Sequence, residues 1–262
     1  MNGENIKYDL KDGIGYITLN RPEALNSFTK PMIDQFEDVL KKCWDDDTCR
    51  AVIITGEGEK AFSAGADVQT FIEEVAKPLG GREWSRYGQV VFNILDRIGK
   101  PSVAALNGLT VGGGLELALA CTFRVASNKA TFGFGEISLG FLPGWGGTSR
   151  ITRLLGKSKA AELILTGKRI DAQRALDIGL VNRVVPANEL ISSSESLLQK
   201  IIKHSPIAIR IALEAIHYAL YLPLEEALVV ESNLGGLACY SEDAKEGLRA
   251  FLEKRKPTFK GQ

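Results

Sequence analysis

The sequence has few of the residues that most often carry chemistry near neutral pH. It contains only two histidines, His204 and His217, and neither stands in a zinc signature or an evident catalytic triad. Its four cysteines include no CxxC pair, so we expect reduced, mostly buried thiols and neither a disulfide framework nor a metal site. Acid–base chemistry must therefore come from carboxylates and backbone dipoles.

An excess of either charge is also absent. Lysine and arginine together number 32, as do aspartate and glutamate, whereas nucleic-acid-binding proteins usually carry a basic excess. No apolar run approaches the ~20 residues that span a bilayer. Residues 1–5 lack the basic-then-apolar pattern of a signal peptide. We therefore expect a cytoplasmic protein with neither a nucleic-acid nor a membrane partner.

The chain has 262 residues, 45% of them hydrophobic, which is enough to bury a full core. Short β-like runs alternate with helical segments, which predicts an α/β core over residues 1–187. The predicted strands are residues 14–19, 51–55, 103–106 and 123–126. A helix capped by Thr29 follows the first strand, and its apolar stripe includes Trp44, which we expect in the core.

The remaining residues, 188–262, have little β signal and many apolar side chains. Helices are expected over residues 190–202, 207–220, 224–237 and 243–254. Such a region either packs on a neighbouring subunit or folds back over its own core. The sequence alone does not separate these alternatives.

Three consecutive glycines at 112–114 follow a predicted strand and precede strong helix formers. Because glycine is unfavourable inside a helix, we expect the triplet at the helix entry, where the first amides lack intrahelical acceptors. An amide near Gly113 is then a candidate donor to a developing oxyanion, and Glu116 follows in the first turn. In the alternative interpretation, the triplet only permits tight packing and Glu116 is a solvated acid.

A second short segment, residues 64–67, follows another predicted strand. Its small side chains would let a second amide point at a ligand, and Asp67 can hold the turn through the backbone. An ordinary turn explains the same residues. Ser63, just before it, has no histidine partner and no G-x-S-x-G frame, so a nucleophilic role is not favoured.

Glu136 is the second candidate acid. It stands among aromatic and aliphatic residues in the glycine-rich segment 132–148. Apolar surroundings raise the pKa of a carboxyl group and suit it to proton donation near neutral pH. The alternative is a structural salt bridge from Glu136 to Arg124 or Arg150.

In this order, these segments resemble the crotonase superfamily, also called the enoyl-CoA hydratase/isomerase family. The resemblance covers nearly the whole chain, through residues 15–22, 64–67, 107–116, 132–148, 163–167, 179–182 and 251–257. It implies an α/β fold built as a crotonase-type spiral of ββα units. It also implies that residues 188–262 form a helical trimerisation region, with assembly as a homotrimer or homohexamer.

The resemblance also implies a chemistry. Enoyl-CoA hydratases of this family carry two glutamates, matched here by Glu116 and Glu136, and an oxyanion hole from two amides, matched by Ala66 and Gly113. The implied reaction is reversible hydration of a trans-2-enoyl-CoA, in fatty acid metabolism, with Glu116 as base and Glu136 as acid. No cofactor is expected, because coenzyme A is part of the acyl-CoA substrate.

Binding of the substrate is assigned to a further set of positions by the same resemblance. They are Ala24, Leu25, Ala64, Asp67, Phe251 and Lys254, of which the last two are expected to reach a neighbouring subunit's site. The basic run 254–256 could instead be a solvated helix end.

Two aromatic residues depart from the family pattern. Phe134 stands where many hydratases have a polar residue, and Trp145 where a smaller one is common. We expect both near the acyl end, where they favour short chains such as crotonyl groups or those formed from 3-hydroxypropionyl-CoA. Residues 78–86 are expected to form a mobile flap over this site. The alternatives left open are a double-bond isomerase, an RNA-binding member of the family and, more distantly, a hydrolase.

Overall fold

The computed structural model describes residues 5–262; residues 1–4, part of the segment in which no signal peptide is expected, lie outside the described residues. Six strands form the larger sheet, in the order β1-β2-β3-β5-β7-β10. They are β1 Ile6–Lys11, β2 Ile14–Leu19, β3 Ala51–Gly56, β5 Ser102–Leu106, β7 Phe123–Ser127 and β10 Arg183–Val185. Only β1 and β2 pair antiparallel, and the other neighbours are parallel. All four predicted strands are thus confirmed.

A second sheet has four strands, in the order β4-β6-β8-β9. They are β4 Ala61–Ser63, β6 Leu109–Val111, β8 Thr131–Gly133 and β9 Ile170–Asp171. Along the chain, β3 leads into β4, β5 into β6 and β7 into β8, and a helix follows each pair. The chain therefore repeats a ββα unit whose first strand joins the large sheet and whose second joins the small one, which is the expected spiral.

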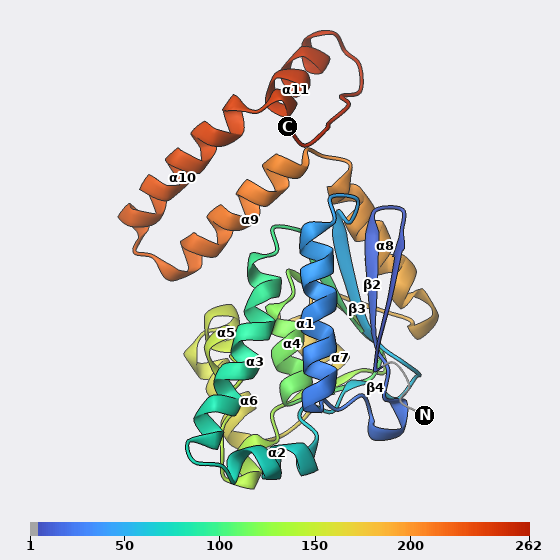
Figure 1. Ribbon diagram of the computed structural model, residues 1–262, viewed down its shortest axis with the longest axis vertical. Helices are drawn as coiled ribbons and strands as arrows, with labels where there is room; N and C mark the ends of the chain where they lie inside the picture. The colour runs from blue at the N-terminus through green and yellow to red at the C-terminus, as the bar shows by residue number, and fades with distance from the viewer. Residues whose placement is uncertain (1–4) are drawn as a thin grey trace.

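The helices of the first two-thirds surround these sheets. They are α1 Lys30–Asp45, α2 Val68–Val75, α3 Gly80–Arg97, α4 Gly113–Ala120, α5 Gly147–Leu155, α6 Lys157–Thr166 and α7 Ala172–Asp177. Short 3-10 turns occur at Pro22–Ala24, Glu136–Leu139 and Ala187–Glu189. In Figure 1, α1 and α3 lie to the left of strands β2 and β3 of the large sheet.

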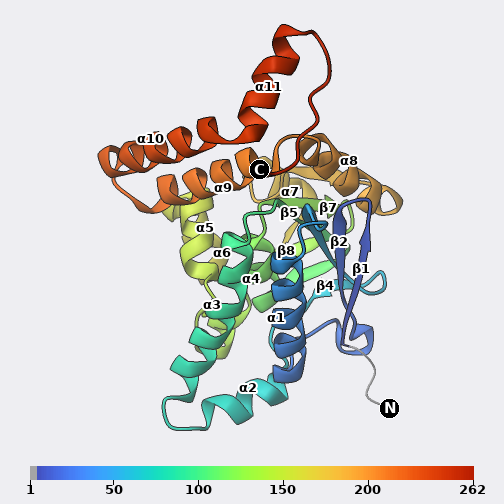
Figure 2. The same ribbon diagram turned by 45° about the horizontal axis from the view of Figure 1, so that its top comes forward.

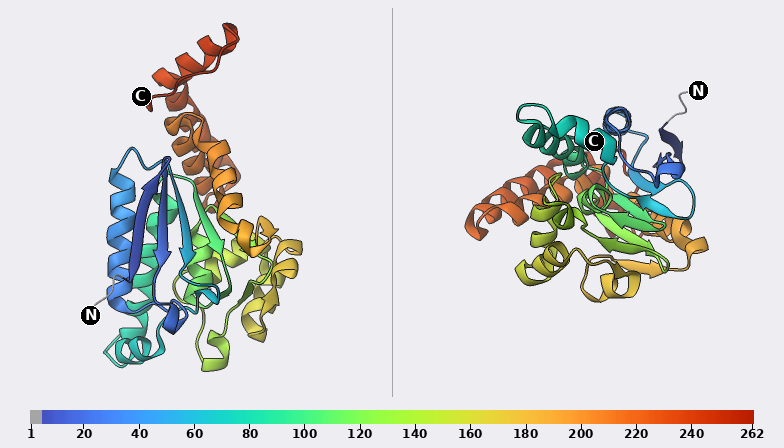
Figure 3. Two further views of the ribbon diagram at one scale, coloured as in Figure 1. Left: turned by 90° about the vertical axis from the view of Figure 1, so that its right-hand side faces the viewer. Right: turned by 90° about the horizontal axis from the view of Figure 1, so that it is seen from below.

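Both faces of the large sheet are buried. On β3, Val52 and Ile54 pack into the main core with α1 and α3, whereas Ile53 faces a second cluster that contains Leu198. Leu198 belongs to α8, Leu190–Ile202, which covers the opposite face from α1 (Figure 3, left). This two-sided burial explains why the strand is apolar at every position and does not alternate.

Helix α1 begins as predicted, but one of its aromatic side chains is not where the sequence analysis placed it. Thr29 caps it, because its side chain accepts a hydrogen bond from the Met32 amide. The expectation that Trp44 lies in the core is wrong, since 47% of this residue is exposed. Trp44 stands four positions after buried Leu40, so the helical spacing alone predicts burial, but it lies in the last turn of α1, which ends at Asp45.

The C-terminal region is helical throughout, as predicted. After α8 come α9 Pro206–Tyr221, α10 Leu224–Tyr240 and α11 Glu242–Leu252. Helices α9 and α10 pack side by side, and α11 stands away from the sheets (Figures 1 and 2). Helix α8 therefore folds over its own core, whereas α10 and α11 project from it. The domain boundary between residues 187 and 188 stays a prediction.

Candidate active site

The glycine triplet lies at the junction of β6 and α4. Gly112 has φ +53° and ψ −131°, a conformation that side chains disfavour, and it turns the chain into the helix. Gly113 is the first residue of α4, so its N–H has no intrahelical acceptor and sits at the positive end of the helix dipole. The predicted helix entry is confirmed.

The loop between β4 and α2 brings a second amide to the same place. Phe28 forms an isolated parallel bridge with Ala66, in which the Phe28 N–H bonds Gly65 and the Phe28 carbonyl accepts from Asp67. In that pattern the N–H of Ala66 itself points away from Phe28. A Cβ on Gly113 would lie 3.4 Å from the Ala66 nitrogen, so the two segments abut.

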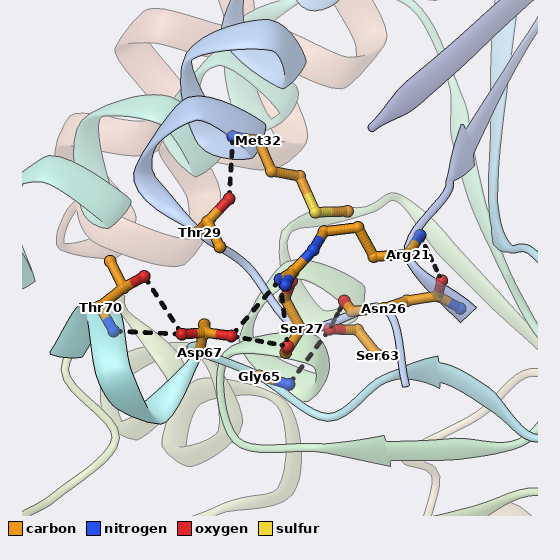
Figure 4. A network of polar contacts seen from close by, with 9 residues as sticks. All are labelled: Arg21, Asn26, Ser27, Thr29, Met32, Ser63, Gly65, Asp67 and Thr70. Carbon is orange, nitrogen blue, oxygen red and sulfur yellow. Dashed lines mark hydrogen bonds and ion pairs between the residues drawn. The ribbon is translucent and has the colours of Figure 1, made fainter. Parts of the chain in front are cut away.

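Polar contacts from neighbouring residues hold the loop between β4 and α2 in place (Figure 4). Asp67 caps α2 by accepting from the Thr70 N–H at 3.1 Å, and its other oxygen lies 3.5 Å from Arg21. Arg21 also donates to the Ser27 carbonyl at 2.7 Å. Asp67 therefore orders the backbone of the loop, and its predicted part in substrate binding stays a prediction.

Ser63 is fully buried and contributes to the same scaffold. Its hydroxyl donates to the Asn26 carbonyl at 2.8 Å and accepts from the Gly65 N–H at 3.1 Å (Figure 4). The hydroxyl thus positions the residue that precedes Ala66. This arrangement agrees with the expectation that Ser63 is not a nucleophile.

A cavity of about 590 Å³ opens beside the two amides. Five of the predicted site residues line it: Ala64, Ala66, Gly113, Glu116 and Glu136. The rest of the wall is mostly apolar and includes Val68, Phe71, Trp84, Leu139, Phe141, Leu142 and Trp145. The structure therefore brings both acids and both amides to one cavity.

Glu116 is 3% exposed, so it is not a solvated first-turn acid. Its Oε1 accepts a hydrogen bond of 2.7 Å from the Gly147 N–H. Burial, together with the nearby charge of Glu136, raises the pKa of Glu116 to about 8, although the N–H groups of Gly147 and Trp145 oppose the shift. A carboxyl group with such a pKa exchanges protons near neutral pH.

Glu136 is 9% exposed and lies at the start of a 3-10 turn. Its Oε2 is buried and has no hydrogen-bond partner within residues 5–262. Burial raises the pKa of Glu136 above its ordinary value. The alternative of a salt bridge is wrong, because Arg124 donates to the Leu180 carbonyl at 2.8 Å and Arg150 pairs with Asp96 at 2.7 Å.

Comparison with known proteins agrees with this geometry. The profile of the Enoyl-CoA hydratase/isomerase family matches residues 9–262. The chain belongs to this family. It is 38% identical to a short-chain-enoyl-CoA hydratase of Clostridium acetobutylicum, over 98% of this chain and 97% of the relative. The same identity, over 98% of both chains, relates it to a crotonyl-CoA hydratase of Syntrophomonas wolfei.

A solved structure of the enoyl-CoA hydratase/isomerase family has the same fold. The crystal structure of an enoyl-CoA hydratase from Bacillus anthracis superposes with a TM-score of 0.94 at 37% identity, covering 99% of this chain and all of that one. The family resemblance read from the motifs and the crotonase-type fold are both confirmed.

One residue that orders the site of this family member was not predicted. Gly147, at the start of α5, holds Glu116 through its N–H, and a Cβ on Gly147 would lie 2.6 Å from Glu116 Cγ. Only glycine therefore lets α5 approach the carboxylate so closely. The glycine pair at 146–147 was visible in the sequence, but nothing there indicated its contact with a residue 31 positions earlier.

The predicted substrate-binding residues fall into two groups. Ala24 ends a 3-10 turn and Leu25 follows with φ +52°, where its carbonyl accepts from the Ala64 N–H at 2.9 Å. Phe251 is 82% exposed on α11, and neither it nor Lys254 lines the cavity of its own chain. Their predicted role, which needs a second chain, stays a prediction.

Within the basic run 254–256, Arg255 already has acidic partners. It is bound within its own chain, at 2.6 Å from both Glu246 and Glu253.

One expectation about the acyl end, that of Phe134, is wrong, and another, that of the flap, takes a more definite form. Phe134 is fully buried and does not line the cavity, because its ring packs behind Gly147, with Cε1 3.0 Å from where a Cβ on Gly147 would lie. Of residues 78–86, expected in a mobile flap, residues 80–86 form the first turns of α3; Gly81, Trp84 and Ser85 line the cavity, and the mobility of the segment stays a prediction. The sequence did not reveal this because the helix starts at two glycines.

Three of the four cysteines, Cys43, Cys49 and Cys121, are buried, Cys239 is exposed, and all are free. In the part of the chain that the structure describes, no three His, Cys, Asp or Glu side chains gather as metal ligands. Over the same residues, no helix is long and apolar enough to cross a bilayer.

Proposed function

We propose that this protein catalyses the reversible hydration of trans-2-enoyl-CoA to 3-hydroxyacyl-CoA. The observation that carries the proposal is the convergence of Glu116, Glu136 and the amides of Ala66 and Gly113 on one cavity. The names of the two relatives, a short-chain-enoyl-CoA hydratase and a crotonyl-CoA hydratase, agree with this proposal.

The two amides are proposed to bind the thioester oxygen. When water adds to Cβ, negative charge develops on that oxygen, and two fixed N–H donors stabilise it more than they stabilise the ground state. The Gly113 amide also lies at the positive end of α4. Because loop 63–67 is held by buried hydrogen bonds, the donors need no reorganisation during the reaction.

The two carboxyl groups are proposed to share the proton transfers. In hydration, Glu116 removes a proton from water as the oxygen attacks Cβ, and Glu136 donates a proton to Cα. In dehydration the roles reverse. A pKa near 8 makes Glu116 a stronger base than an ordinary carboxylate. The unpaired Oε2 of Glu136 leaves that group free to face the substrate. Because the charge of Glu136 contributes to the raised pKa of Glu116, we propose that the two groups exchange protons as a pair.

Coenzyme A is proposed to enter only as part of the substrate, so no separate cofactor takes part. Its pantetheine arm would run along the backbone of Ala24, Leu25 and Ala64, which border the amide loop. Phe251 and Lys254 would come from a neighbouring chain, since neither lines the cavity of its own chain.

We also propose a homotrimer or homohexamer. Many large apolar side chains on α10 and α11 are exposed in the single chain, including Leu228, Leu237, Leu248, Phe251 and Leu252. A surface of this kind usually marks a protein–protein contact. A monomeric mass in light scattering would contradict the assembly.

The free thiols agree with a proposed cytoplasmic location.

Glutamine substitutions test the reaction. Glu116→Gln and Glu136→Gln should each lower kcat for crotonyl-CoA hydration by roughly 10²–10⁴-fold, because each removes one proton-transfer group. The loss of conjugated-thioester absorbance measures the rate. Glu162→Gln, an exposed position on α6, is the matched control and should keep wild-type activity.

The outcome also separates the alternatives. If the protein instead shifts the double bond of an enoyl-CoA, and this isomerisation survives Glu116→Gln but is abolished by Glu136→Gln, a single acid–base group suffices and the protein is a double-bond isomerase. Release of free thiol from the substrate would indicate a hydrolase. A salt-dependent shift of labelled RNA, without turnover of any enoyl-CoA, would indicate the RNA-binding alternative.

A further inference from the structure

The cavity has an exposed rim and a buried inner end. At the rim, Val68 is 67% exposed and Leu139 is 69% exposed. At the inner end, Trp84 is 5% exposed and Trp145 is 3% exposed. Coenzyme A is large and highly charged, so we place it outside the exposed rim; an acyl group bound at the two amides then extends toward the buried tryptophans.

The indole of Trp145 is held in one orientation. Its Nε1 donates to the Trp84 carbonyl at 3.1 Å. Its ring centroid lies 5.2 Å from that of Trp84, 5.6 Å from Phe92 and 6.0 Å from Phe28, all edge to face. Turning the indole aside would break the hydrogen bond and all three aromatic contacts, each of which is stabilising. The ring is therefore a rigid wall.

Two glycines allow the Trp145 indole to pack close to the proposed oxyanion hole. A Cβ on Gly88 of α3 would lie 2.3 Å from Trp145 Cγ, and one on Gly113 would lie 2.6 Å from Trp145 Cζ3. The indole thus touches the residue whose amide is proposed to hold the thioester oxygen. The space beyond it is filled by Phe28 and Phe92, both fully buried. An acyl chain has no room to continue in this direction.

We propose that Trp145 is the residue that limits acyl chain length, so that the cavity accepts enoyl groups of about the size of crotonyl and excludes longer ones. The inference rests on the proposed function, because it takes the thioester to lie at Ala66 and Gly113. Trp84 is a positioning residue that fixes the indole through its carbonyl.

Replacement of Trp145 by alanine tests whether this side chain limits the length of the acyl group. Values of kcat/KM are measured for crotonyl-CoA and for the eight-carbon trans-2-octenoyl-CoA, and the ratio of the two is compared between variants. Excluding even one methylene from a pocket changes kcat/KM by about 10-fold or more. Trp145→Ala should therefore raise the octenoyl-to-crotonyl ratio at least about 10-fold, even if both absolute rates fall.

Two controls separate a wall from a general structural role. Trp44→Ala removes the same side chain from an exposed position on α1 and should leave the ratio unchanged. Gly88→Ala, added to Trp145→Ala, places a methyl group in the vacated space and should move the ratio back toward the wild-type value. A destabilised but otherwise unchanged pocket would not respond to this second substitution.

Each outcome decides the inference. An unchanged ratio in a folded Trp145→Ala, with crotonyl-CoA still hydrated, overturns it and leaves the proposed function intact. A wild-type protein that hydrates neither thioester overturns the proposed function instead. If Trp145→Ala does not fold, Trp145→Leu is measured in the same way, and a ratio equal to that of the wild type overturns the inference.

Discussion

Replacing Gly65 by alanine is the sharpest perturbation of the proposed oxyanion hole. Gly65 has φ +91°, and a Cβ on it would lie 2.8 Å from the Gly113 nitrogen and 3.1 Å from the Val111 carbonyl oxygen. Both contacts are with backbone, which cannot swing aside as a flexible side chain can. The methyl group must therefore push the loop that carries Ala66 away from the entry of α4.

The size of the effect follows from these contacts. Separation of the two amides removes at least one donor from the thioester oxygen, which costs about 3–4 kcal/mol of transition-state stabilisation, or ~10²–10³ in kcat. The left-handed backbone by itself costs alanine about 1–2 kcal/mol of folding stability. In a protein of this size that lowers Tm by roughly 2–8 °C.

The assay is the initial rate of crotonyl-CoA hydration, followed by loss of conjugated-thioester absorbance, together with Tm. Gly179→Ala is the matched control, because Gly179 has φ +85° and a Cβ on it meets no atom within 4 Å. Both variants should lose Tm through the same backbone strain, whereas only Gly65→Ala should lose kcat. Similar rates in the two folded variants would refute the assignment of the Ala66 and Gly113 amides.

Two further predictions concern stability. Asp67→Ala removes the cap of α2 and the contact with Arg21, and should lower the free energy of unfolding by about 1 kcal/mol; an unchanged urea midpoint would contradict the capping role. The pKa of Glu116 is 4.5 before burial and about 8 in the folded protein, so between these values the folded state holds a proton that the unfolded chain has released. The free energy of unfolding should therefore fall as pH rises through this range, by up to about 1.4 kcal/mol per pH unit. The fall should be smaller in Glu116→Gln, and equal slopes in urea unfolding would argue against the raised pKa.

Much of the fold was predictable because its signals are local. The apolar run at 51–55 marks a strand covered on both faces, and Thr29 marks the start of α1, since capping depends only on neighbouring residues. The glycine triplet likewise placed Gly113 at a helix entry. Trp44 was misplaced because its spacing from Leu40 fits the buried row, yet it lies in the last turn of α1, where the side chain is exposed.

The candidate site was only partly predictable. Glu116 and Glu136 could be named from short motifs, and the structure brings them to one cavity. Phe134 and Trp145 belong to one segment and seemed equivalent in the sequence, yet Trp145 lines the cavity and Phe134 lies behind it. The difference arises because the chain turns at the 3-10 helix Glu136–Leu139 between them.

The sequence by itself determined which groups are available: two acidic side chains beside glycine-rich turns, small residues at the amide loop, and helices with apolar surfaces at the C-terminal end. These properties depend on residue type and near neighbours. Only the tertiary structure decided that Gly147 bonds Glu116, that burial raises the pKa of that carboxyl group, and that the Trp145 indole closes the inner end of the cavity. Each of these depends on contacts between segments distant in the chain, which packing of the ββα units brings together.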